Sequence, residues 1–348
     1  MPLRDIAGHR HLLALAAGAA VRGSLPPSLI FAGPEGVGKR LTAIALAQLL
    51  NCPAPVPFAP DDDRGSPSGA AEPLRDACGV CSSCVRIARG THADVMMLAP
   101  GESGTIKIDQ IREAIERSGY RPFEGRRRVV VVDDAEAMVV EAQNALLKTL
   151  EEPPASSVFV LVTSRPELLL PTVRSRCQRL RFGRLAPAEV AAVLLARHDY
   201  EPGNAQAAAA SSDGSVGMAL EGSSEEFVRA REAAAGLLED AARTADPRRR
   251  LEGARALTTA GRAGADRDEL ARRLRSLAGL LRDLAALHAR VAPRDLANAD
   301  RADSLGRLLR AFDAGRVVKA FAAVDQALAA LDRNASPKIV ADWVALQL

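Results

Sequence analysis

Residues able to do chemistry gather at two places in the first quarter of the sequence. The first is the glycine-rich segment GPEGVGKR, Gly33 to Arg40, and the second is CGVCSSC, Cys78 to Cys84. Glycine-rich loops followed by lysine cradle phosphate groups, and clustered thiolates bind zinc. The sequence therefore predicts a nucleotide-binding loop and a separate metal site.

The glycine-rich segment follows the phosphate-loop consensus G-x-x-x-x-G-K-[ST] up to its last position. The candidate nucleotide-binding residues of the loop are Gly33, Gly36, Gly38 and Lys39. Arg40 stands where the consensus has the hydroxyl that holds Mg²⁺, and Thr42, about 200° further round a helix, is a poor substitute. The pattern predicts nucleotide-binding ancestry with impaired hydrolysis. The alternative is a tight strand-to-helix turn without a ligand.

A second acidic segment, VVVVDDAE, supplies candidates for binding Mg²⁺. Asp133 fits the strand-end aspartate that holds magnesium in phosphate-loop enzymes, and Asp134 is its neighbour. Glu136 lies three residues beyond Asp133, and we expect it to point elsewhere. The alternative is a strand end that is capped by acidic residues and binds no metal.

The cysteine segment has the spacing C-x2-C-x2-C. Its members, Cys78, Cys81 and Cys84, need a fourth ligand to complete a zinc tetrahedron. Cys52 is the first candidate and His92 the second. Four protein ligands would make a closed, structural Zn²⁺ site, and an iron–sulfur cluster is the less favoured occupant.

Arginines surround the fifth cysteine in TVRSRCQRL, Thr172 to Leu180. An arginine such as Arg176 could act as an arginine finger, which stabilises the γ-phosphate charge in a neighbouring subunit. On spacing alone, a cluster of surface ion pairs is the favoured interpretation.

Uniform apolar runs alternate with amphipathic segments up to about Phe182, a pattern typical of a parallel sheet covered by helices. The expected strands are 28–33, 93–98, 127–134 and 157–164, and the expected helices are 5–22, 40–50, 107–119 and 141–154. A Pro-, Asp- and Gly-rich insert at 53–77 is expected to be flexible.

Beyond Phe182 the pattern is helical, and two apolar stripes predict bundle cores. The stripes are Leu270, Leu274, Leu277, Leu281 and Leu284, and Phe321, Val324, Leu328 and Leu331. The arginine triplets at 126–128 and 248–250 are interpreted as solvated faces, with contact to DNA phosphates as the less favoured alternative.

Composition limits the class of protein. The chain has 348 residues, a net charge of +3 and 3% aromatic residues, which disfavours strong binding of nucleic acid by this chain alone. We identify no signal peptide and no membrane span, so a cytoplasmic protein is expected.

Together these motifs resemble the clamp-loader subunits of bacterial DNA polymerase III, in the AAA+ class, and among them the δ′ family. The segments that carry the resemblance are CGVCSSCVRIARGTHADV, RVVVVDDAEAM, EAQNALLKTLEEPP, FVLVTSRPELLLPTVRSRC, GSVGMAL and SPKIVADWVALQL. They cover most of the chain in order, and the S-R-C triplet and the NALLKTLEEPP helix are the specific features.

The resemblance implies a fold and a set of partners. It implies an α/β AAA+ core domain at 1–182 with a zinc module at about 50–92, a helical lid domain at 183–222 and an all-α collar domain at 223–348. The partners would be the γ/τ motor subunits and the δ subunit, with the β sliding clamp and primer–template DNA as substrates of the complex.

The resemblance also assigns residue roles. Cys52 and the three clustered cysteines would hold zinc, Thr163 and Ser164 would fall at sensor 1, and Arg176 would be the arginine finger acting in trans. Motor subunits have Ser or Thr after the loop lysine, Glu after the strand-end Asp, and an arginine at sensor 2. This chain has Arg40, Asp134 and Gly217 at these three positions, in that order.

These departures predict a non-hydrolysing subunit of the polymerase holoenzyme, a nucleotidyltransferase, with no ATPase activity of its own. The alternatives are a catalytically active γ/τ-like ATPase and a stand-alone zinc-containing DNA-binding protein. The near-neutral charge and the scarcity of aromatic residues disfavour the last of these.

Overall fold

The chain forms two compact units, Met1–Arg184 and Leu185–Leu348, each with its own hydrophobic core. The computed structural model describes residues 1–58, 74–244, 246–257, 263–293 and 296–348. The predicted division of the helical part at residue 222 into lid and collar stays a prediction.

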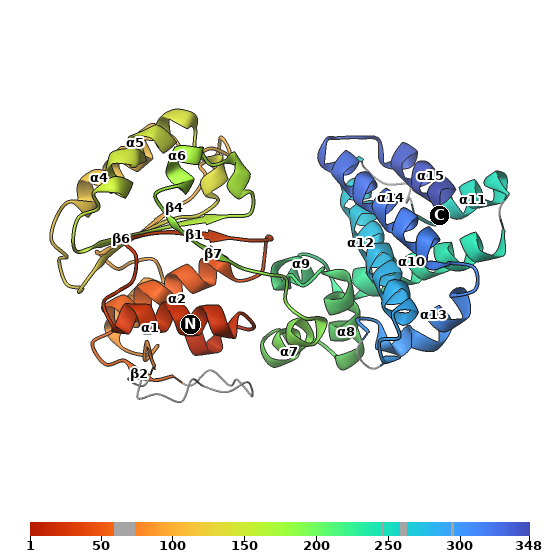
Figure 1. Ribbon diagram of the computed structural model, residues 1–348, viewed down its shortest axis with the longest axis horizontal. Helices are drawn as coiled ribbons and strands as arrows, with labels where there is room; N and C mark the ends of the chain where they lie inside the picture. Colours follow the sequence, from red (N-terminus) through yellow and green to blue (C-terminus); the bar gives the residue numbers. More distant parts are fainter. Residues whose placement is uncertain (59–73, 245, 258–262, 294–295) are drawn as a thin grey trace. The chain divides into compact units, whose positions relative to one another are not determined.

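A five-stranded parallel sheet in the order β4-β5-β6-β1-β7 forms the centre of the first unit (Figure 1). The strands are β1 (Ser28–Ala32), β4 (Val95–Leu98), β5 (Arg128–Val132), β6 (Ser157–Thr163) and β7 (Gln178–Arg181). The first four are the predicted apolar runs. The sequence analysis missed β7, because this edge strand carries mainly exposed polar side chains.

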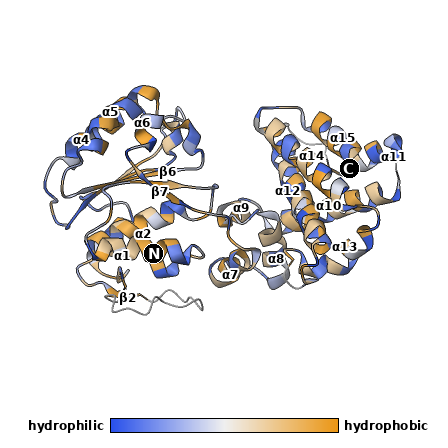
Figure 2. Ribbon diagram, in the orientation of Figure 1, coloured by the Kyte–Doolittle hydropathy of each residue, from blue (hydrophilic) through white to orange (hydrophobic). Residues whose placement is uncertain are grey.

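Helices cover both faces of the sheet, as predicted. Alternate residues such as Ile30 and Val130 face one layer, and Phe31 and Val131 face the other. The helices of the first layer are α4 (Ile108–Ser118), α5 (Val140–Glu151) and α6 (Pro171–Arg174); α1 (Arg10–Val21), α2 (Lys39–Asn51) and α3 (Ser82–Ala88) belong to the second. Figure 2 shows hydrophobic residues along the strands and on the helices that flank them.

The two ends of the predicted flexible insert are ordered. Strands β2 (Val56–Pro57) and β3 (Arg75–Asp76) form a two-stranded antiparallel ribbon. The buried Asp76 carboxylate accepts hydrogen bonds from the backbone N–H groups of Leu3 and Arg4, at 3.1 and 2.9 Å. The prediction of a flexible segment over all of 53–77 is therefore wrong at its ends, and residues 59–73 lie outside the described residues.

The second unit is helical throughout its described part, which confirms the predicted change after the sheet. Its α-helices are α7 (Pro187–Arg197), α8 (Pro202–Ser211), α9 (Val216–Leu220), α10 (Ser224–Arg243), α11 (Pro247–Ala254), α12 (Ala263–His288), α13 (Ala302–Leu308), α14 (Ala314–Asp332) and α15 (Pro337–Gln347). No helix within the described residues is long and apolar enough to cross a membrane. The parallel sheet with helices on both faces, the cysteine cluster and the helical second unit confirm the predicted α/β domain followed by an all-α part.

One predicted core stripe is complete and the other is not. All five leucines of the first stripe are fully buried in α12. In α14, Val324 and Leu331 are buried, but Phe321 is 37% exposed, so its assignment to the core is wrong. Spacing alone does not show where the packed face of a helix ends.

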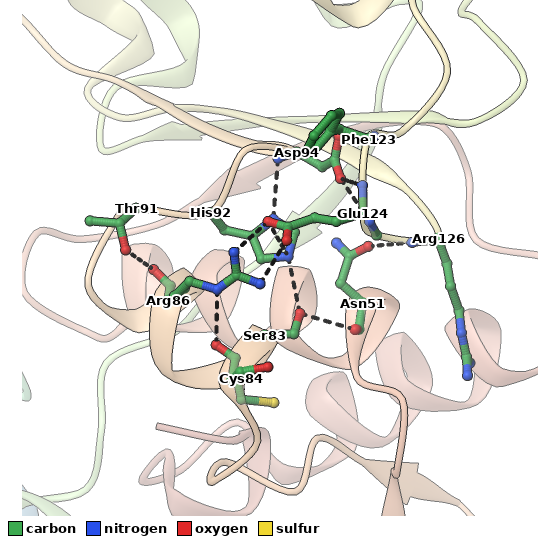
Figure 3. Close-up of polar contacts among 12 residues, drawn as sticks. Asn51, Ser83, Cys84, Arg86, Thr91, His92, Asp94, Phe123, Glu124 and Arg126 are labelled. Carbon is green, nitrogen blue, oxygen red and sulfur yellow. Dashed lines mark hydrogen bonds and ion pairs between the residues drawn. The ribbon is translucent and has the colours of Figure 1, made fainter.

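Two buried side chains hold the loop between α4 and β5 (Figure 3). The Asp94 carboxylate accepts hydrogen bonds from the N–H groups of Phe123, Glu124 and Gly125, at 2.7 to 2.9 Å. The Asn51 amide oxygen accepts from the N–H groups of Arg126 and Arg127. These acceptors fix the loop because buried N–H groups need partners.

The third arginine of the triplet at 126–128 departs from the expected solvated face. Arg128 is 9% exposed, and its guanidinium lies 3.5 Å from Asp94 and donates to the carbonyl oxygen of Arg121. Arg128 is therefore a structural residue.

We predict that Asp94→Asn destabilises the fold by about 2 kcal/mol at neutral pH, because charge-assisted hydrogen bonds become neutral ones. Burial opposes ionisation of Asp94, but the three N–H donors and Arg128 outweigh it and hold its pKa below the usual value. The stability contributed by this carboxylate is therefore present above about pH 4 and is lost as the pH falls through the lowered pKa.

Urea unfolding followed by circular dichroism at pH 7 and at pH 3 measures this effect. Asp109→Asn on the exposed face of α4 is the matched control and should change stability little. An equal loss for both variants at pH 7 would contradict the role of Asp94.

Candidate functional site

The phosphate-loop segment connects β1 to α2 at the carboxyl edge of the sheet. Gly36 and Gly38 have φ values of 69° and 97°, in the left-handed region that favours glycine. A Cβ atom on Gly33 would lie 2.2 Å from the carbonyl oxygen of Phe182. The three predicted glycines are therefore required by the backbone of the loop itself.

Lys39 is the first residue of α2 and is only 7% exposed. Its Nζ atom donates to the carbonyl oxygens of Gly33 and Pro34, at 2.8 and 2.5 Å. Burial lowers the pKa of Lys39, and carboxylates led by Glu136 partly oppose that shift. The ammonium group thus lies against the backbone of its own loop.

Arg40 forms an ion pair with Asp133, the acid predicted to hold magnesium. Its Nη1 atom lies 3.2 Å from Oδ2 of Asp133, whose residue is 8% exposed. Burial and the neighbouring Asp134 raise the pKa of Asp133, and Arg40 opposes this shift. A guanidinium group therefore neutralises the carboxylate at which phosphate-loop enzymes hold a divalent cation.

Thr42 does not replace the missing hydroxyl ligand in this structure. Its Oγ1 atom donates to the carbonyl oxygen of Gly38 at 2.9 Å, within the first turn of α2. This agrees with the prediction that Thr42 is a poor substitute. The sequence analysis missed the ion pair between Arg40 and Asp133. The opposite charges of the two side chains were the only sequence signal for it.

The acids after β5 and the hydroxyls after β6 also meet at this edge. Glu136 accepts hydrogen bonds from the backbone N–H and the hydroxyl of Ser164, at 3.0 and 2.5 Å. Burial raises the pKa of Glu136, but the hydroxyls of Ser164 and Thr163 and backbone N–H groups outweigh burial and lower it. The expectation that Glu136 points elsewhere is therefore wrong, and Asp134 is instead exposed with a φ of 47°.

Thr163 is fully buried at the end of β6. Its carbonyl oxygen accepts a hydrogen bond from the N–H of Gly33 at 3.2 Å, and its Oγ1 atom accepts from the N–H of Arg165. The structure thus brings the predicted sensor-1 residue to the first glycine of the loop. Gly217 lies in α9 of the second unit.

The four predicted zinc ligands form one cluster. The Sγ atoms of Cys52, Cys78, Cys81 and Cys84 all lie within 4.8 Å of one another. Tetrahedral zinc with bonds of about 2.3 Å separates sulfur atoms by roughly 3.8 Å, so the cluster fits this ion with little adjustment.

Backbone N–H groups support the thiolate form of Cys78, whereas burial raises the pKa of Cys52 and the pKa of Cys84. The N–H groups of Cys78, Cys81 and Cys84 donate to the sulfurs of Cys52, Cys78 and Cys81, at 3.3 to 3.4 Å. Burial raises the pKa of Cys78, but N–H donors from Val80 and Cys81 outweigh it and lower the value to about 6. Burial raises the pKa of Cys177, which lies outside the cluster, to about 12.

His92, the second candidate for the fourth zinc ligand, is engaged elsewhere (Figure 3). Its Nε2 atom lies 3.1 Å from the Ser83 hydroxyl and 3.7 Å from Glu124, and its Nδ1 atom accepts from the N–H of Asp94. Burial lowers the pKa of His92, opposed by Glu124. Cys52, not His92, therefore lies with the other three cysteines.

Arg176 pairs with Glu151 at the C-terminal end of α5. Its Nε atom donates to Oε1 of Glu151 at 2.7 Å, and its Nη1 atom donates to the carbonyl oxygen of Thr172 at 2.8 Å. The side chain remains 30% exposed. Surface ion pairs contribute only about 0–1 kcal/mol, so this guanidinium can exchange Glu151 for another anion at low cost.

A surface hollow of about 330 Å³ adjoins Arg176 and shows which sheet edge it occupies. Its lining includes Pro27, Ser28, Glu151, Arg176 and Gln178. Ser28 and Gln178 are the first residues of β1 and β7. Arg176 therefore lies at the amino edge of the sheet, whereas the phosphate loop lies at the carboxyl edge of β1.

Known proteins resemble about half of this chain. The family model described as "DNA polymerase III, delta subunit" matches residues 8–186. The δ′ subunit of Escherichia coli K12 is 37% identical over 195 residues, which are 56% of this chain and 53% of that protein. The δ′ subunit of Pseudomonas aeruginosa is 39% identical over 146 residues, 42% of this chain and 39% of that protein.

The γ/τ subunits resemble the chain to a similar degree. The γ/τ subunit of Mycobacterium tuberculosis H37Rv is 34% identical over 193 residues, 56% of this chain and 30% of that protein. The matches thus span between 30% and 53% of the length of these three relatives. Since the family model covers more than half of its residues, the chain belongs to the DNA polymerase III delta-subunit family.

Proposed function

We propose that this chain is a δ′-type subunit of a DNA polymerase III clamp loader, which does not hydrolyse ATP itself. It completes the ATP site of a neighbouring γ/τ motor subunit through Arg176. The complex, which also contains a δ subunit, loads the β sliding clamp onto primer–template DNA.

The ion pair between Arg40 and Asp133 carries the proposal that hydrolysis is lost. Phosphoryl transfer by phosphate-loop enzymes depends on Mg²⁺ held by the loop hydroxyl and the strand-end acid. Here the hydroxyl position is an arginine, and that arginine lies 3.2 Å from the acid. Removal of one transition-state charge partner commonly costs about 3 kcal/mol, and Asp134 and Gly217 add two further departures.

The place of Arg176 supports a role in trans. Arg176 lies at the amino edge of the sheet, and the phosphate loop lies at the carboxyl edge. The five residues of β1 separate the two edges by about 15 Å. An arginine at the opposite edge does not reach a nucleotide in its own loop. Its exposure and its exchangeable pair with Glu151 suit contact with a γ-phosphate held by a neighbour.

The cysteine cluster is proposed to hold a structural Zn²⁺ ion through Cys52, Cys78, Cys81 and Cys84. Four sulfur ligands leave no open position, so the ion would stabilise the module and take no part in chemistry. It would join the end of α2 to the segment that leads into α3, across the insert.

The alternative is a catalytically active γ/τ-like ATPase, favoured by the intact glycines and Lys39 and by the γ/τ relatives. ATP turnover of the isolated chain separates the two functions. Turnover equal to that of a motor subunit would reject the non-hydrolysing proposal, and turnover at background would reject the alternative.

We predict about one zinc per chain in protein purified without a chelator. Cys81→Ser is expected to lower the metal content and the thermal stability of the module, because it removes a ligand. Elemental analysis by mass spectrometry measures the metal content, and Cys177→Ser is the matched control, since this buried thiol lies outside the cluster. A metal-free wild-type protein that is fully folded would contradict the zinc site.

We predict that Arg176→Ala leaves the fold intact but lowers ATP turnover at the neighbouring site that it completes by about 10³-fold, since an arginine finger stabilises transition-state charge. The measurement is the ATPase rate of the complex assembled from this chain, the motor subunits and the δ subunit. The control is Arg174→Ala, because Arg174 is an exposed arginine at the end of α6, two residues before Arg176. An unchanged rate in a complex that contains the Arg176 variant would remove Arg176 from this role.

A further inference from the structure

We propose that a groove at the amino edge of the sheet binds an extended acidic peptide segment of a partner protein. Apolar side chains of the peptide lie on the floor of the groove, and its carboxylates pair with arginines on the rim. None of the four clustered cysteines lines this groove, and the phosphate loop lies at the opposite edge of the sheet. The inference concerns the isolated chain and does not depend on the role proposed for Arg176.

Two adjoining surface hollows, of about 400 and 260 Å³, make up this amino-edge groove. The larger lies at the C-terminal ends of α1 and α2, and the smaller lies at the first residues of β1 and β6. The two hollows share Ala20, Leu50 and Arg127 in their linings, so they form one continuous depression. Two hollows in a row suit a length of chain better than a compact ligand.

The floor of the amino-edge groove is apolar. In the larger hollow it consists of Val21, Leu49, Leu50 and Pro55. In the smaller hollow, Leu25 and prolines from both sides of the edge, Pro27, Pro153 and Pro154, continue it. An apolar side chain that enters such a depression loses contact with water, which favours binding at about 25 cal/mol per Å².

The rim of the groove carries three arginines and no acid. Arg75, Arg126 and Arg127 line the larger hollow, and neither lining contains Asp or Glu among the described residues. Within the part of the chain that the structure describes, none of the three guanidinium groups forms an ion pair. Arg75 and Arg127 each donate to a carbonyl oxygen, of Pro55 and Ala155, and a guanidinium has five N–H donors. Most of the donors and all of the charge therefore remain for an anionic partner.

The backbone of the rim is held in place before any partner binds. Asn51, the last residue of α2, is only 4% exposed, and its Oδ1 atom accepts from the N–H groups of Arg126 and Arg127 at 2.9 and 3.0 Å (Figure 3). Arg75 belongs to β3, which pairs with β2. A rim that is already ordered lowers the conformational entropy that binding costs.

Two helix ends act against an anion in this groove. Val21 and Asn51 are the last residues of α1 and α2, and a helix C-terminus carries roughly half a negative charge. Three guanidinium charges exceed this opposing charge. We therefore expect modest affinity for a short acidic peptide, with a Kd of about 10–100 μM.

The lining favours a peptide over the phosphate backbone of a nucleic acid. Phosphates gain from the arginines alone, and no aromatic side chain among the described lining residues offers a surface on which bases could stack. In an extended peptide, successive side chains point to opposite sides, and residues two apart are about 6.6 Å from each other. Alternating apolar and acidic residues thus place one kind of side chain on the floor and the other toward the rim.

The test is fluorescence anisotropy of a fluorescein-labelled heptapeptide, DLDLDLD, titrated with the full chain at low ionic strength and without chelators. Unlabelled DLDLDLD is the competitor. Two matched peptides separate the contributions: DSDSDSD lacks the apolar side chains, and KLKLKLK has the opposite charge. We expect DSDSDSD to bind about tenfold more weakly than DLDLDLD, and KLKLKLK to show no binding.

Three variants locate the peptide on the chain. Arg126→Glu should weaken binding of DLDLDLD about tenfold, because attraction becomes repulsion while the backbone bond to Asn51 is kept. Val21→Ser should weaken it about threefold, because part of the apolar floor is lost. Arg112→Glu, at an exposed position of α4 in the other helix layer, is the matched control and should bind as the wild type does. Circular dichroism checks that each variant is folded.

Three results from the wild-type chain would overturn the proposal, and they hold even where a variant fails to fold. The first is no displaceable binding of DLDLDLD up to about 1 mM. The second is equal affinity for DSDSDSD, which would leave the apolar floor without a role. The third is displacement of the labelled peptide by single-stranded oligothymidylate at lower concentration than by unlabelled DLDLDLD, which would assign the groove to nucleic acid. Unchanged affinity of a folded Arg126→Glu variant would likewise place the peptide elsewhere and reject the groove.

Discussion

Parallel pairing of β1, β5 and β6 places the residues of the candidate nucleotide site next to one another. In a parallel sheet every strand ends at the same edge, and the crevice beyond that edge is where ligands bind. Ala32 pairs with Thr163, and Val132 pairs with Leu161. The glycine loop, the acids and the hydroxyls that follow these strands therefore emerge close together, although about 100 residues of sequence separate the first from the second. The chemistry of the edge depends on this register.

The exchange of a metal ion for an arginine changes what that edge can do. Mg²⁺ binds oxygen atoms octahedrally and bridges phosphates to protein acids. A guanidinium is permanently charged, but it is a planar set of hydrogen-bond donors tied to its own backbone. Arg40 can balance the charge of Asp133, yet it does not coordinate two phosphate oxygens as Mg²⁺ does. This difference between a guanidinium and Mg²⁺ supports the proposed loss of hydrolysis.

Much of this arrangement could be predicted from the sequence, because long apolar runs and glycine spacing have direct physical meaning. Four strands were predicted since buried parallel strands are uniformly apolar, whereas β7 was missed since its Gln178 and Arg179 side chains are exposed. The cysteine spacing predicted a cluster, and the fold brings Cys52 into it. The direction of Glu136 could not be predicted, because it depends on a short 3₁₀ turn, Ala135–Ala137, after a left-handed Asp134. The Arg40–Asp133 pair likewise needs three-dimensional proximity that spacing does not supply.

The arginine ion pairs at the two edges of the sheet differ in the exposure of their acids. At the carboxyl edge, the cations are already satisfied: Lys39 bonds its own loop, and Arg40 pairs with the 8%-exposed Asp133. At the amino edge, Arg176 pairs with Glu151, whose side chain is 49% exposed, so solvent and partners can compete for it. The Arg40 side chain is itself 60% exposed, so the two pairs differ in the burial of the acid and not of the arginine. The exposed acid at the amino edge supports the proposed contact between Arg176 and an anion that a neighbouring subunit holds.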